Sequence, residues 1–296
     1  MEMTTAEGKK EPLHMTKTAI VTDSTAYIPP DMREERSITM VPLNVHFGEE
    51  SYQEEWDLTT DDFYEKMRQA ETLPKTSQPS IGLFEETFRS LGAEYDEIIV
   101  ITLSSGISGT YQTAVAAADM VDDLPVHVFD SGISCMIQGF YVLEAAALAA
   151  EEKEPALILR HLEEKRQHTR AYFMADDLSH LHRGGRLNGA QLFIGSMLQI
   201  KPVLHFEDKK IVPYEKVRTE KKAVAKIKKL LDEGLKDGTP AHVAVIHGNC
   251  PDKADALLDE LQPAYPHAVF YKSYFGPVIG THLGPGSIGI GWMPKG

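Results

Sequence analysis

EIIVITLSSGISGTYQTAVAAADMV, the stretch from Glu97 to Val121, decides the fold. It begins with an almost continuously apolar run, Glu97–Ser105, as expected of a strand that is buried on both faces of a parallel sheet. A glycine-containing loop follows, and an amphipathic helix is predicted over Gly109–Val121. This order of strand, loop and helix predicts one unit of a parallel sheet that is covered by helices.

The rest of the first half repeats this alternation. Further strands are predicted over Thr18–Thr25, Ile38–Phe47 and Pro125–Gly132. Further amphipathic helices are predicted over Asp61–Ala70, Gly82–Leu91 and Ile137–Glu152. We therefore expect an N-terminal α/β domain over residues 16–169, after a disordered extension formed by residues 1–15.

The second half has a different pattern and predicts a smaller α+β domain over residues 170–296. Its predicted elements are, in order, a strand at Arg170–Leu178, a helix at Gly189–Leu198, a hairpin at Val203–Val217 that turns at Asp208–Lys209, a helix at Glu220–Leu235, a strand at His242–Gly248 and a helix at Asp252–Gln262. The tail is interpreted as two strands around a glycine-rich turn. The fold class is thus α/β with two domains.

The composition of the chain excludes several classes of protein. The 296 residues carry a formal net charge of -14, which repels phosphate backbones and makes nucleic acid an improbable partner. Two cysteines are too few for a disulfide framework or a cysteine zinc site, and they favour a cytoplasmic location. The polar first fifteen residues contain no secretory signal, and the most apolar helical stretch, Ile137–Ala150, is too short to be a transmembrane segment.

The loop after the Glu97–Ser105 strand is a candidate anion site. It lies at the carboxyl edge of the predicted sheet, where ligands bind. Ser108 is a plausible N-cap, free N–H groups at the helix start attract an anion, and Ser105 can donate a hydroxyl. The alternative is a tight turn built from small residues. The loop is neither a P-loop nor a GxGxxG motif.

Other segments contain polar side chains that either bind a ligand or have only a structural role. In PKTSQPS (Pro74–Ser80) the two prolines either hold the polar residues between them in a rigid ligand-binding loop or precede a helix that Ser80 caps. The histidine in GPVIGTHLGPGSIGIG, His282, either holds a carboxylate or lies on the surface of a glycine-rich turn. Asp23 either caps a turn or binds a ligand. The cations Arg183, Arg186 and Arg218 form either an anion or docking site or a solvated face.

Taken together, the segments VTDST, PLNVHFGEESYQE, KTSQPS, TLSSGISGTYQTA, GGRLN, IKPVLHFEDKKIVPYEKVRTEKKA and GTHLGPGSIGIG resemble the DegV family, which includes the fatty-acid-binding FakB proteins. The resemblance implies a ligand tunnel between the two domains that holds a long-chain fatty acid. It implies that Thr76, Ser105 and His282 bind the carboxylate and that Arg218 docks a partner, a fatty acid kinase with a dihydroxyacetone-kinase-like domain. Supporting contacts are expected from Ser77, Gly106, Ser108, Gly109 and Thr281.

The favoured function is therefore a carrier in phospholipid metabolism that presents a fatty acid to the kinase and performs no chemistry itself. The bound fatty acid is its ligand, and neither a metal nor another cofactor is expected. The main alternative is an acyl hydrolase in which Ser105 is the nucleophile and His282 the base, although the G-x-S-x-G elbow is missing. A regulatory protein with a structural lipid is a third reading. Candidate tunnel-wall residues are Phe193, Ile194, Met197 and Leu198.

Overall fold

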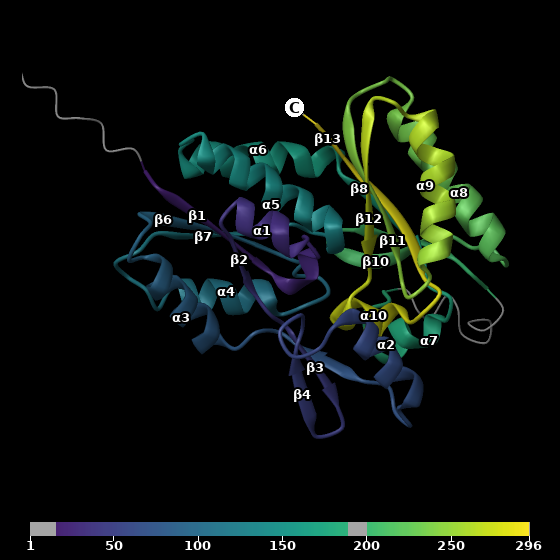
Figure 1. The fold of residues 1–296 in the computed structure, drawn as a ribbon, viewed down its shortest axis with the longest axis horizontal. Coiled ribbons are helices and arrows are strands. Elements are labelled where there is room, and N and C mark those ends of the chain that lie inside the picture. The colour runs from purple at the N-terminus through teal and green to yellow at the C-terminus, as the bar shows by residue number, and fades with distance from the viewer. Residues whose placement is uncertain (1–15, 189–199, 296) are drawn as a thin grey trace, which may run out of the picture.

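A computed structural model of the chain describes residues 16–188 and 200–295. Two large sheets, one small sheet and the helices between and around them make up the described part (Figure 1). The predicted extension over residues 1–15, the predicted helix at Gly189–Leu198 and the tunnel-wall candidates Phe193, Ile194, Met197 and Leu198 lie outside the described residues. Within the described residues, no helix is both long enough and apolar enough to cross a membrane.

The first sheet is four-stranded and parallel, in the order β2-β1-β6-β7. Its strands are β1 (Thr18–Asp23), β2 (Ile38–Val41), β6 (Glu97–Thr102) and β7 (Val126–Asp130). On one face it packs against α3 (Ile81–Leu91) and α4 (Thr110–Ala118), and on the other against α5 (Cys135–Ala150). A short 3-10 turn, η1 (Ser24–Ala26), and α1 (Pro30–Glu35) lead from β1 to β2. The predicted parallel α/β sheet is confirmed.

One prediction in this half is wrong, because Ile38–Phe47 is not a single strand. The parallel strand β2 ends at Val41, and Pro42 follows, which has no N–H with which to continue the ladder. The chain then enters a separate antiparallel sheet in the order β4-β3-β5, formed by β3 (Asn44–Phe47), β4 (Glu50–Gln53) and β5 (Lys75–Ser77), with α2 (Thr60–Gln69) inserted before β5. This small sheet carries Thr76.

The third sheet has six strands in the order β10-β9-β8-β13-β11-β12, and only the β11–β12 pair is parallel. Its strands are β8 (Arg170–Met174), β9 (Val203–Glu207), β10 (Lys210–Glu215), β11 (Ala241–His247), β12 (Ala268–Tyr274) and β13 (Ile288–Pro294). The helices α8 (Glu220–Leu235) and α9 (Pro251–Ala264) cover one face. The predicted hairpin is confirmed, and its turn residues Asp208 and Lys209 both have positive φ, as a tight two-residue turn requires.

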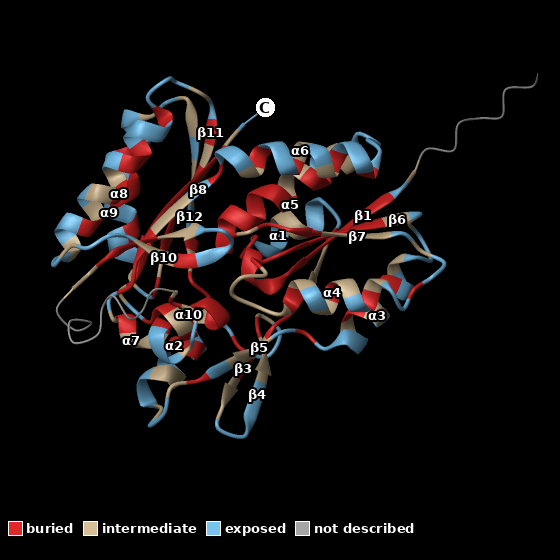
Figure 2. Ribbon diagram, turned by 180° about the vertical axis from the view of Figure 1, so that it is seen from behind, coloured by how far each residue is buried: buried red, intermediate tan, exposed pale blue. Residues whose placement is uncertain are grey.

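Helix α5 lies between the two large sheets and contacts strands of both, and α6 (Pro155–His168), which the sequence pattern did not reveal, packs beside it against β13. Figure 2 shows α5 as mostly buried along its length. This position explains why its sequence is apolar all round instead of amphipathic. The boundary between residues 169 and 170 stays a prediction.

The glycine-rich turn near the C-terminus is not only a turn, because it contains α10 (Pro277–Leu283) between β12 and β13. Pro277 occupies the first helical turn, and Gly284 ends the helix with a φ of 72°. The predicted strand Arg170–Leu178 is also too long. It ends at Met174, and Asp177 caps α7 (Leu178–Arg183) through the N–H of Ser179. The helices α7 and α10 pack against each other.

Candidate functional site

A cavity lies between the two large sheets, and the space between its lining atoms amounts to about 790 Å³ where it is counted out to the solvent. Most of its lining is apolar and comes from α5, from the third sheet and from α10; it includes Ile137, Phe173, Phe206, Ile211, Ile246, Phe275, Val278, Ile279, Leu283 and Ile290. An apolar cavity thus lies at the predicted location, between the two halves of the chain. Such a lining suits an apolar ligand.

Polar side chains gather at one end of this cavity, and we call this group the polar end: Thr76, Ser77, Gln78, Ser108, Arg186 and His282. Thr76 Oγ1 and His282 Nε2 are 2.8 Å apart and form a hydrogen bond. Thr76 comes from β5 and His282 from the last turn of α10, so two segments 206 residues apart in sequence meet here. The predicted Thr76 and His282 are brought together, and Ser77 and Ser108 lie nearby.

His282 is held neutral. Burial, followed by the charges of Arg186 and His180, lowers the pKa of its imidazole to about 3. Its Nδ1 atom is buried and has no hydrogen-bond partner among the described groups. The backbone of Gly184 packs against this nitrogen so closely that a Cβ at residue 184 would be 2.3 Å from Nδ1. The GGR segment therefore sets the position of the imidazole.

Arg186 supplies positive charge to the polar end. Its Nε donates to the carbonyl of Ile107 at 3.1 Å, and its Nη1 donates to the carbonyl of Gly184. No acidic side chain of the described residues forms an ion pair with it, and burial lowers its pKa. An arginine that is held by carbonyls and lacks an acidic partner is suited to binding a ligand carboxylate.

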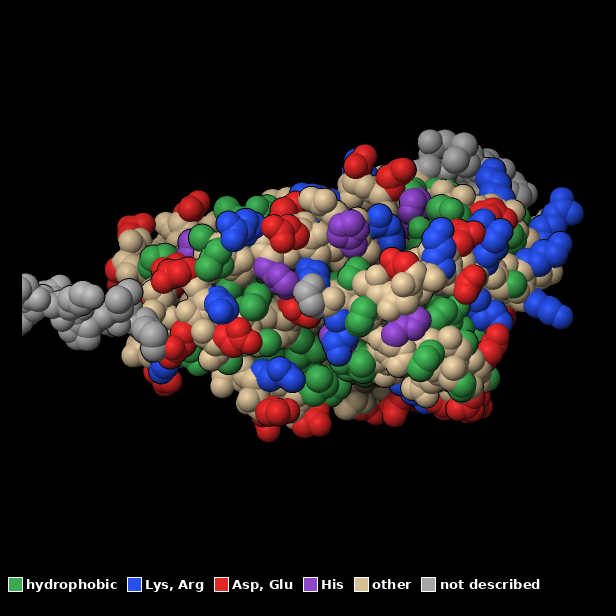
Figure 3. Space-filling view, turned by 90° about the horizontal axis from the view of Figure 1, so that it is seen from above, with side chains coloured by type: hydrophobic (Ala, Val, Ile, Leu, Met, Phe, Trp, Pro, Cys, Tyr) green, Lys and Arg blue, Asp and Glu red, His purple; other side chains and the backbone are tan. Residues whose placement is uncertain are grey.

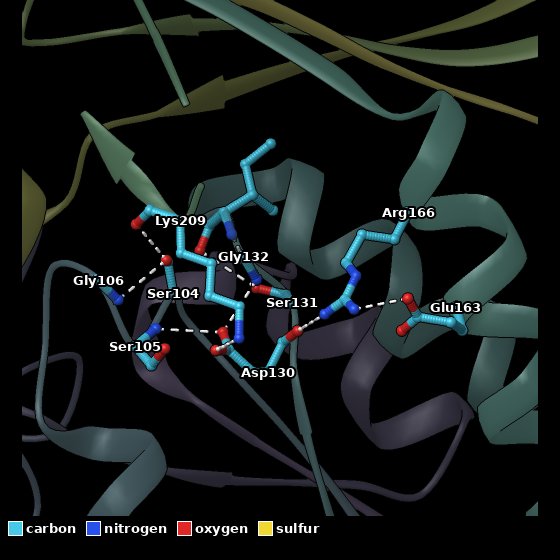
Figure 4. Close-up of polar contacts among 10 residues, drawn as sticks. Ser104, Ser105, Gly106, Asp130, Ser131, Gly132, Glu163, Arg166 and Lys209 are labelled. Atoms are coloured by element: carbon cyan, nitrogen blue, oxygen red, sulfur yellow. Dashed lines mark hydrogen bonds and ion pairs between the residues drawn. The ribbon is translucent and has the colours of Figure 1, made fainter. Parts of the chain in front are cut away.

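Ser105 is not among the residues that line the cavity. Its N–H donates to Asp130 Oδ1 at 3.1 Å (Figure 4). Burial alone would raise the pKa of Asp130, but the bonds from Ser105, the Lys209 ammonium 2.9 Å away and the N–H of Gly132 lower it overall. Ser105 thus contacts a buried carboxylate at the edge of the parallel sheet through its backbone N–H.

The tip of the β9–β10 hairpin packs against the loop after β6, which was predicted to be an anion site. Ser104 Oγ donates to the carbonyl of Lys209 at 2.6 Å, and a Cβ at Gly106 would be only 2.1 Å from that carbonyl oxygen. We call Ser104, Ser105, Gly106, Asp130 and Lys209 the hairpin clasp. The clasp joins the parallel sheet to the third sheet through the chain's own backbone.

The remaining predictions around these loops have mixed outcomes. Ser108 is not the N-cap of α4, because the helix begins at Thr110 after Gly109, and the Ser108 hydroxyl instead accepts from the N–H of Thr110 at 3.3 Å. The backbone of Gly109 lies against the side chain of Gln78. Thr281 is buried and donates to the carbonyl of Pro277 within α10.

Two capping predictions are confirmed. Ser80 is the N-cap of α3 and accepts from the N–H of Leu83 at 3.2 Å. Asp23 caps η1 by accepting from the N–H of Thr25, and it also accepts from the N–H of Leu103 at 2.7 Å. Because burial raises the pKa of Asp23, these bonds satisfy a carboxyl group that water does not reach. These contacts match the capping role predicted for Asp23.

Glu54 supports the site and was not predicted. It is fully buried and accepts from the hydroxyls of Ser24 at 2.5 Å and Tyr27 at 3.0 Å and from the N–H of Val278 at 2.8 Å. These bonds connect the end of β1 to the first turn of α10, the helix that carries His282. Burial raises the pKa of Glu54 to about 8. No sequence signal separates it from its acidic neighbours Glu49, Glu50 and Glu55.

Cys135 also lines the cavity and begins α5 with a φ of 61°. Burial raises the pKa of its thiol to about 12, so the reactive thiolate is scarce at neutral pH. Ser105 bonds to Asp130 and His282 bonds to Thr76, so Ser105 and His282 do not form a nucleophile–base pair in this structure. The described residues contain no cluster of three or more His, Cys, Asp or Glu suited to a metal.

Arg218 is exposed and immediately precedes Thr219, the N-cap of α8. Figure 3 shows Lys and Arg side chains gathered at the end of the molecule that α8 and α9 form. Several of these lysines pair with glutamates, such as Lys226 with Glu215 and Lys228 with Glu260. Arg218, which was predicted to dock a partner, is therefore not one of the residues that line the cavity.

Comparison with known proteins agrees with this architecture. A family model described as "Uncharacterised protein, DegV family" matches residues 17–295. The protein DegV of Bacillus subtilis is 54% identical over 278 residues, which is 94% of this chain and 99% of that protein. The crystal structure of DegV, a fatty acid binding protein from Bacillus subtilis, superposes with a TM-score of 0.91 at 53% identity, covering 95% of this chain and 100% of that one. A structure that shows fatty acid binding of a DegV family protein from Thermus thermophilus has a TM-score of 0.87 at 30% identity, covering 94% and 100% of the two chains.

Proposed function

Because the chain belongs to the DegV family, we propose that it binds a long-chain fatty acid, with the acyl chain in the apolar cavity and the carboxylate at the polar end. The observation that carries the proposal is an apolar cavity that ends at the hydrogen-bonded pair of Thr76 and His282. Relatives described as fatty-acid-binding proteins, at up to 53% identity, support the choice of ligand.

The polar end fits a carboxylate. A carboxylate only accepts hydrogen bonds, and the hydroxyls of Thr76 and Ser108, the neutral imidazole of His282 and the guanidinium of Arg186 can all donate. The serine assignment needs an experiment, since the family resemblance selects Ser105, whereas Ser108 lines the cavity. We propose Ser77, Gly109 and Thr281 as supports that position these donors, and Gly106 as part of the hairpin clasp.

The acyl chain would supply most of the affinity. Burial of ~14 methylenes at roughly 0.8 kcal/mol each contributes on the order of 10 kcal/mol before other terms. Ordering of the chain and loss of translational freedom subtract several kcal/mol. Binding in the micromolar range or tighter is therefore expected.

We further propose that the protein is a cytoplasmic carrier that presents the carboxylate to a fatty acid kinase with a dihydroxyacetone-kinase-like domain, as a step in phospholipid metabolism. In this role it performs no chemistry itself. Support comes from the absence of a Ser105–His282 pair and from the high pKa of the Cys135 thiol. Arg218 is proposed to contact the kinase, because it is exposed beside the basic α8 and outside the cavity.

Ligand binding is tested by extracting the purified protein with organic solvent and titrating stripped protein with palmitic acid and with hexadecanol. We expect one fatty acid per chain. His282→Ala and Ser108→Ala should weaken binding of the acid about tenfold or more while leaving the alcohol nearly unchanged, since only the acid needs the polar donors. Ser105→Ala, measured in parallel, decides the serine assignment. An extract without fatty acid, together with no uptake in the titration, overturns the proposal.

The docking role is tested with Arg218→Ala, using a purified fatty acid kinase and ATP. We expect slower formation of acyl phosphate and an unchanged affinity for palmitic acid. Arg160→Ala, which removes an exposed arginine from α6, is the matched control and should leave both unchanged. Equal transfer rates for the two variants exclude Arg218 from docking.

A further inference from the structure

The tip of the β9–β10 hairpin packs on the loop that carries Ser108 of the polar end. The carbonyl of Lys209 accepts from Ser104 Oγ at 2.6 Å, and the backbone of Gly106 lies directly against the same carbonyl oxygen (Figure 4). Within the loop, the N–H of Ser108 donates to the carbonyl of Ser104 at 3.2 Å. The hairpin therefore contacts the same short turn that places Ser108 beside the cavity.

The same hairpin also contacts the segment that carries Arg186. Ile211 in β10 forms a β-bridge with Leu187, the residue directly after Arg186, and its carbonyl accepts from the N–H of Asn188 at 2.9 Å. Ile211 lines the cavity together with Phe206, its partner across the hairpin. The hairpin therefore fixes the backbone next to the arginine of the polar end.

Arg186 completes a closed circuit of contacts. Its Nε donates to the carbonyl of Ile107, in the loop after β6, at 3.1 Å. Three hydrogen bonds thus join three segments end to end, and we call residues 104–108, 186–188 and 209–211 with these bonds the hairpin circuit. Because the circuit is closed, displacement of any one segment strains its bonds to the other two.

The ion pair between Lys209 and Asp130 anchors this circuit to the parallel sheet. Lys209 Nζ lies 2.9 Å from Oδ2 of Asp130, which is the last residue of β7. The carboxylate is buried, whereas 46% of the Lys209 side chain is exposed. Replacement of this lysine therefore removes the anchor without leaving a hole in the core.

We propose that Lys209 is a positioning residue for fatty acid recognition, which through the hairpin circuit holds Ser108 and Arg186 at the spacing that one carboxylate can bridge. The inference rests on the proposed function, in which both groups donate to the carboxylate. A carboxylate accepts from two donors at once only while their separation suits its two oxygen atoms. Release of the hairpin should therefore weaken binding of the head and leave burial of the tail unchanged.

The test removes the bonds of the hairpin tip and compares an acid with an alcohol of equal length. Ser104→Ala combined with Lys209→Met deletes the hydroxyl and the ammonium that hold the tip. In titrations of stripped protein, this variant should bind palmitic acid about tenfold more weakly than the native chain and hexadecanol almost equally well. Lys209→Met alone should shift acid binding in the same direction by a smaller factor, and it keeps the test valid if the double variant does not fold.

Lys210→Met is the matched control. Lys210 is the exposed neighbour of Lys209 in the same hairpin, and its substitution removes the same charge from a residue outside the hairpin clasp. This variant should bind the acid and the alcohol as the native chain does. A loss of acid affinity equal to that of Lys209→Met would show that the effect comes from net charge, and it would overturn the inference.

A double-mutant cycle tests whether Lys209 acts through Arg186. Lys209→Met should lower the acid affinity much less in an Arg186→Met background than in the native chain, because the donor that the circuit positions is already absent. Equal factors in the two backgrounds would show that Lys209 acts independently of Arg186, which contradicts the circuit.

The remaining outcomes separate the two proposals. If the native chain binds no fatty acid, the proposed function is wrong. If the native chain binds palmitic acid and the Lys209 variants bind it equally tightly, the hairpin does not position the polar end and this inference is overturned. An equal loss for the acid and the alcohol also overturns it, because the hairpin would then only hold the two sheets together.

Discussion

Substitution of Gly184 by alanine tests whether the GGR segment positions His282. Gly184 has a φ of -69° and a ψ of -13°, so alanine can adopt this backbone conformation without strain. The added Cβ, however, would lie 2.3 Å from His282 Nδ1 and 2.9 Å from its Cε1. The imidazole must move by about 1 Å to restore an ordinary contact of 3.4 Å or more.

Such a displacement stretches the 2.8 Å hydrogen bond between His282 Nε2 and Thr76 Oγ1. Overpacking of a dense site costs about 1–3 kcal/mol of folding stability. A lost hydrogen bond to a charged group costs about 1.5–3 kcal/mol, which corresponds to a loss of affinity for a fatty acid of roughly tenfold to a hundredfold. The affinity for a fatty alcohol should change far less, because its uncharged head depends less on these donors.

The assay is isothermal titration of stripped Gly184→Ala with palmitic acid and with hexadecanol, together with urea unfolding. Gly82→Ala is the matched control, because a Cβ at this position in α3 meets nothing within 4 Å. This control should bind as the native chain does and gain about 0.5–1 kcal/mol of stability. Unchanged acid binding in Gly184→Ala, or an equal loss for acid and alcohol, would refute the argument.

Two further predictions concern the supports of the site. The pKa of Glu54 is raised from 4.5 to about 8, so its contribution to stability is full below pH 4.5 and is lost as the pH rises through 8. Glu54→Gln should therefore flatten this part of the pH dependence of unfolding by urea, whereas the exposed Glu49→Gln should keep the native slope. Gly106→Ala should push the Lys209 carbonyl out of the hairpin clasp, lower stability by about 1–3 kcal/mol and speed fatty acid release in stopped-flow measurements; a release rate equal to that of Gly82→Ala would show that the clasp does not restrain the cavity.

Local signals in the sequence were sufficient for much of the fold. Helix α8 was predicted with its observed bounds, because its apolar residues recur at helical spacing, and the structure adds Thr219 as its N-cap. The parallel sheet followed from continuous apolar strands. The small sheet of β3, β4 and β5 was missed because its strands have three or four residues and are defined by pairing between segments distant in the chain. The glycines of α10 concealed a helix that tertiary contacts support.

The candidate site could be predicted only in part. Thr76 and His282 meet at the cavity, but nothing in the spacing of the loop distinguishes Ser105 from Ser108, since both are serines near a glycine. The position of the β9–β10 hairpin gives the two serines different surroundings, and that position depends on tertiary contacts between distant segments. Glu54 was missed for the same reason, because two of its donors come from η1 and its C-cap and the third comes from α10, and only folding brings these segments together.

The hairpin clasp has a consequence for what else this molecule can bind. The carboxyl edge of a parallel sheet is where α/β proteins usually accept a nucleotide or another anion. Here the carbonyl and the ammonium of Lys209, a residue of the same chain, already occupy this edge. A phosphate from solution would have to displace both groups and would lie close to the negative charge of Asp130. Because Lys209 is part of the same chain, its effective concentration at this edge is on the order of millimolar or more. This edge therefore joins the parallel sheet to the third sheet, and Ser108, three residues after Ser105 in the same loop, lines the cavity.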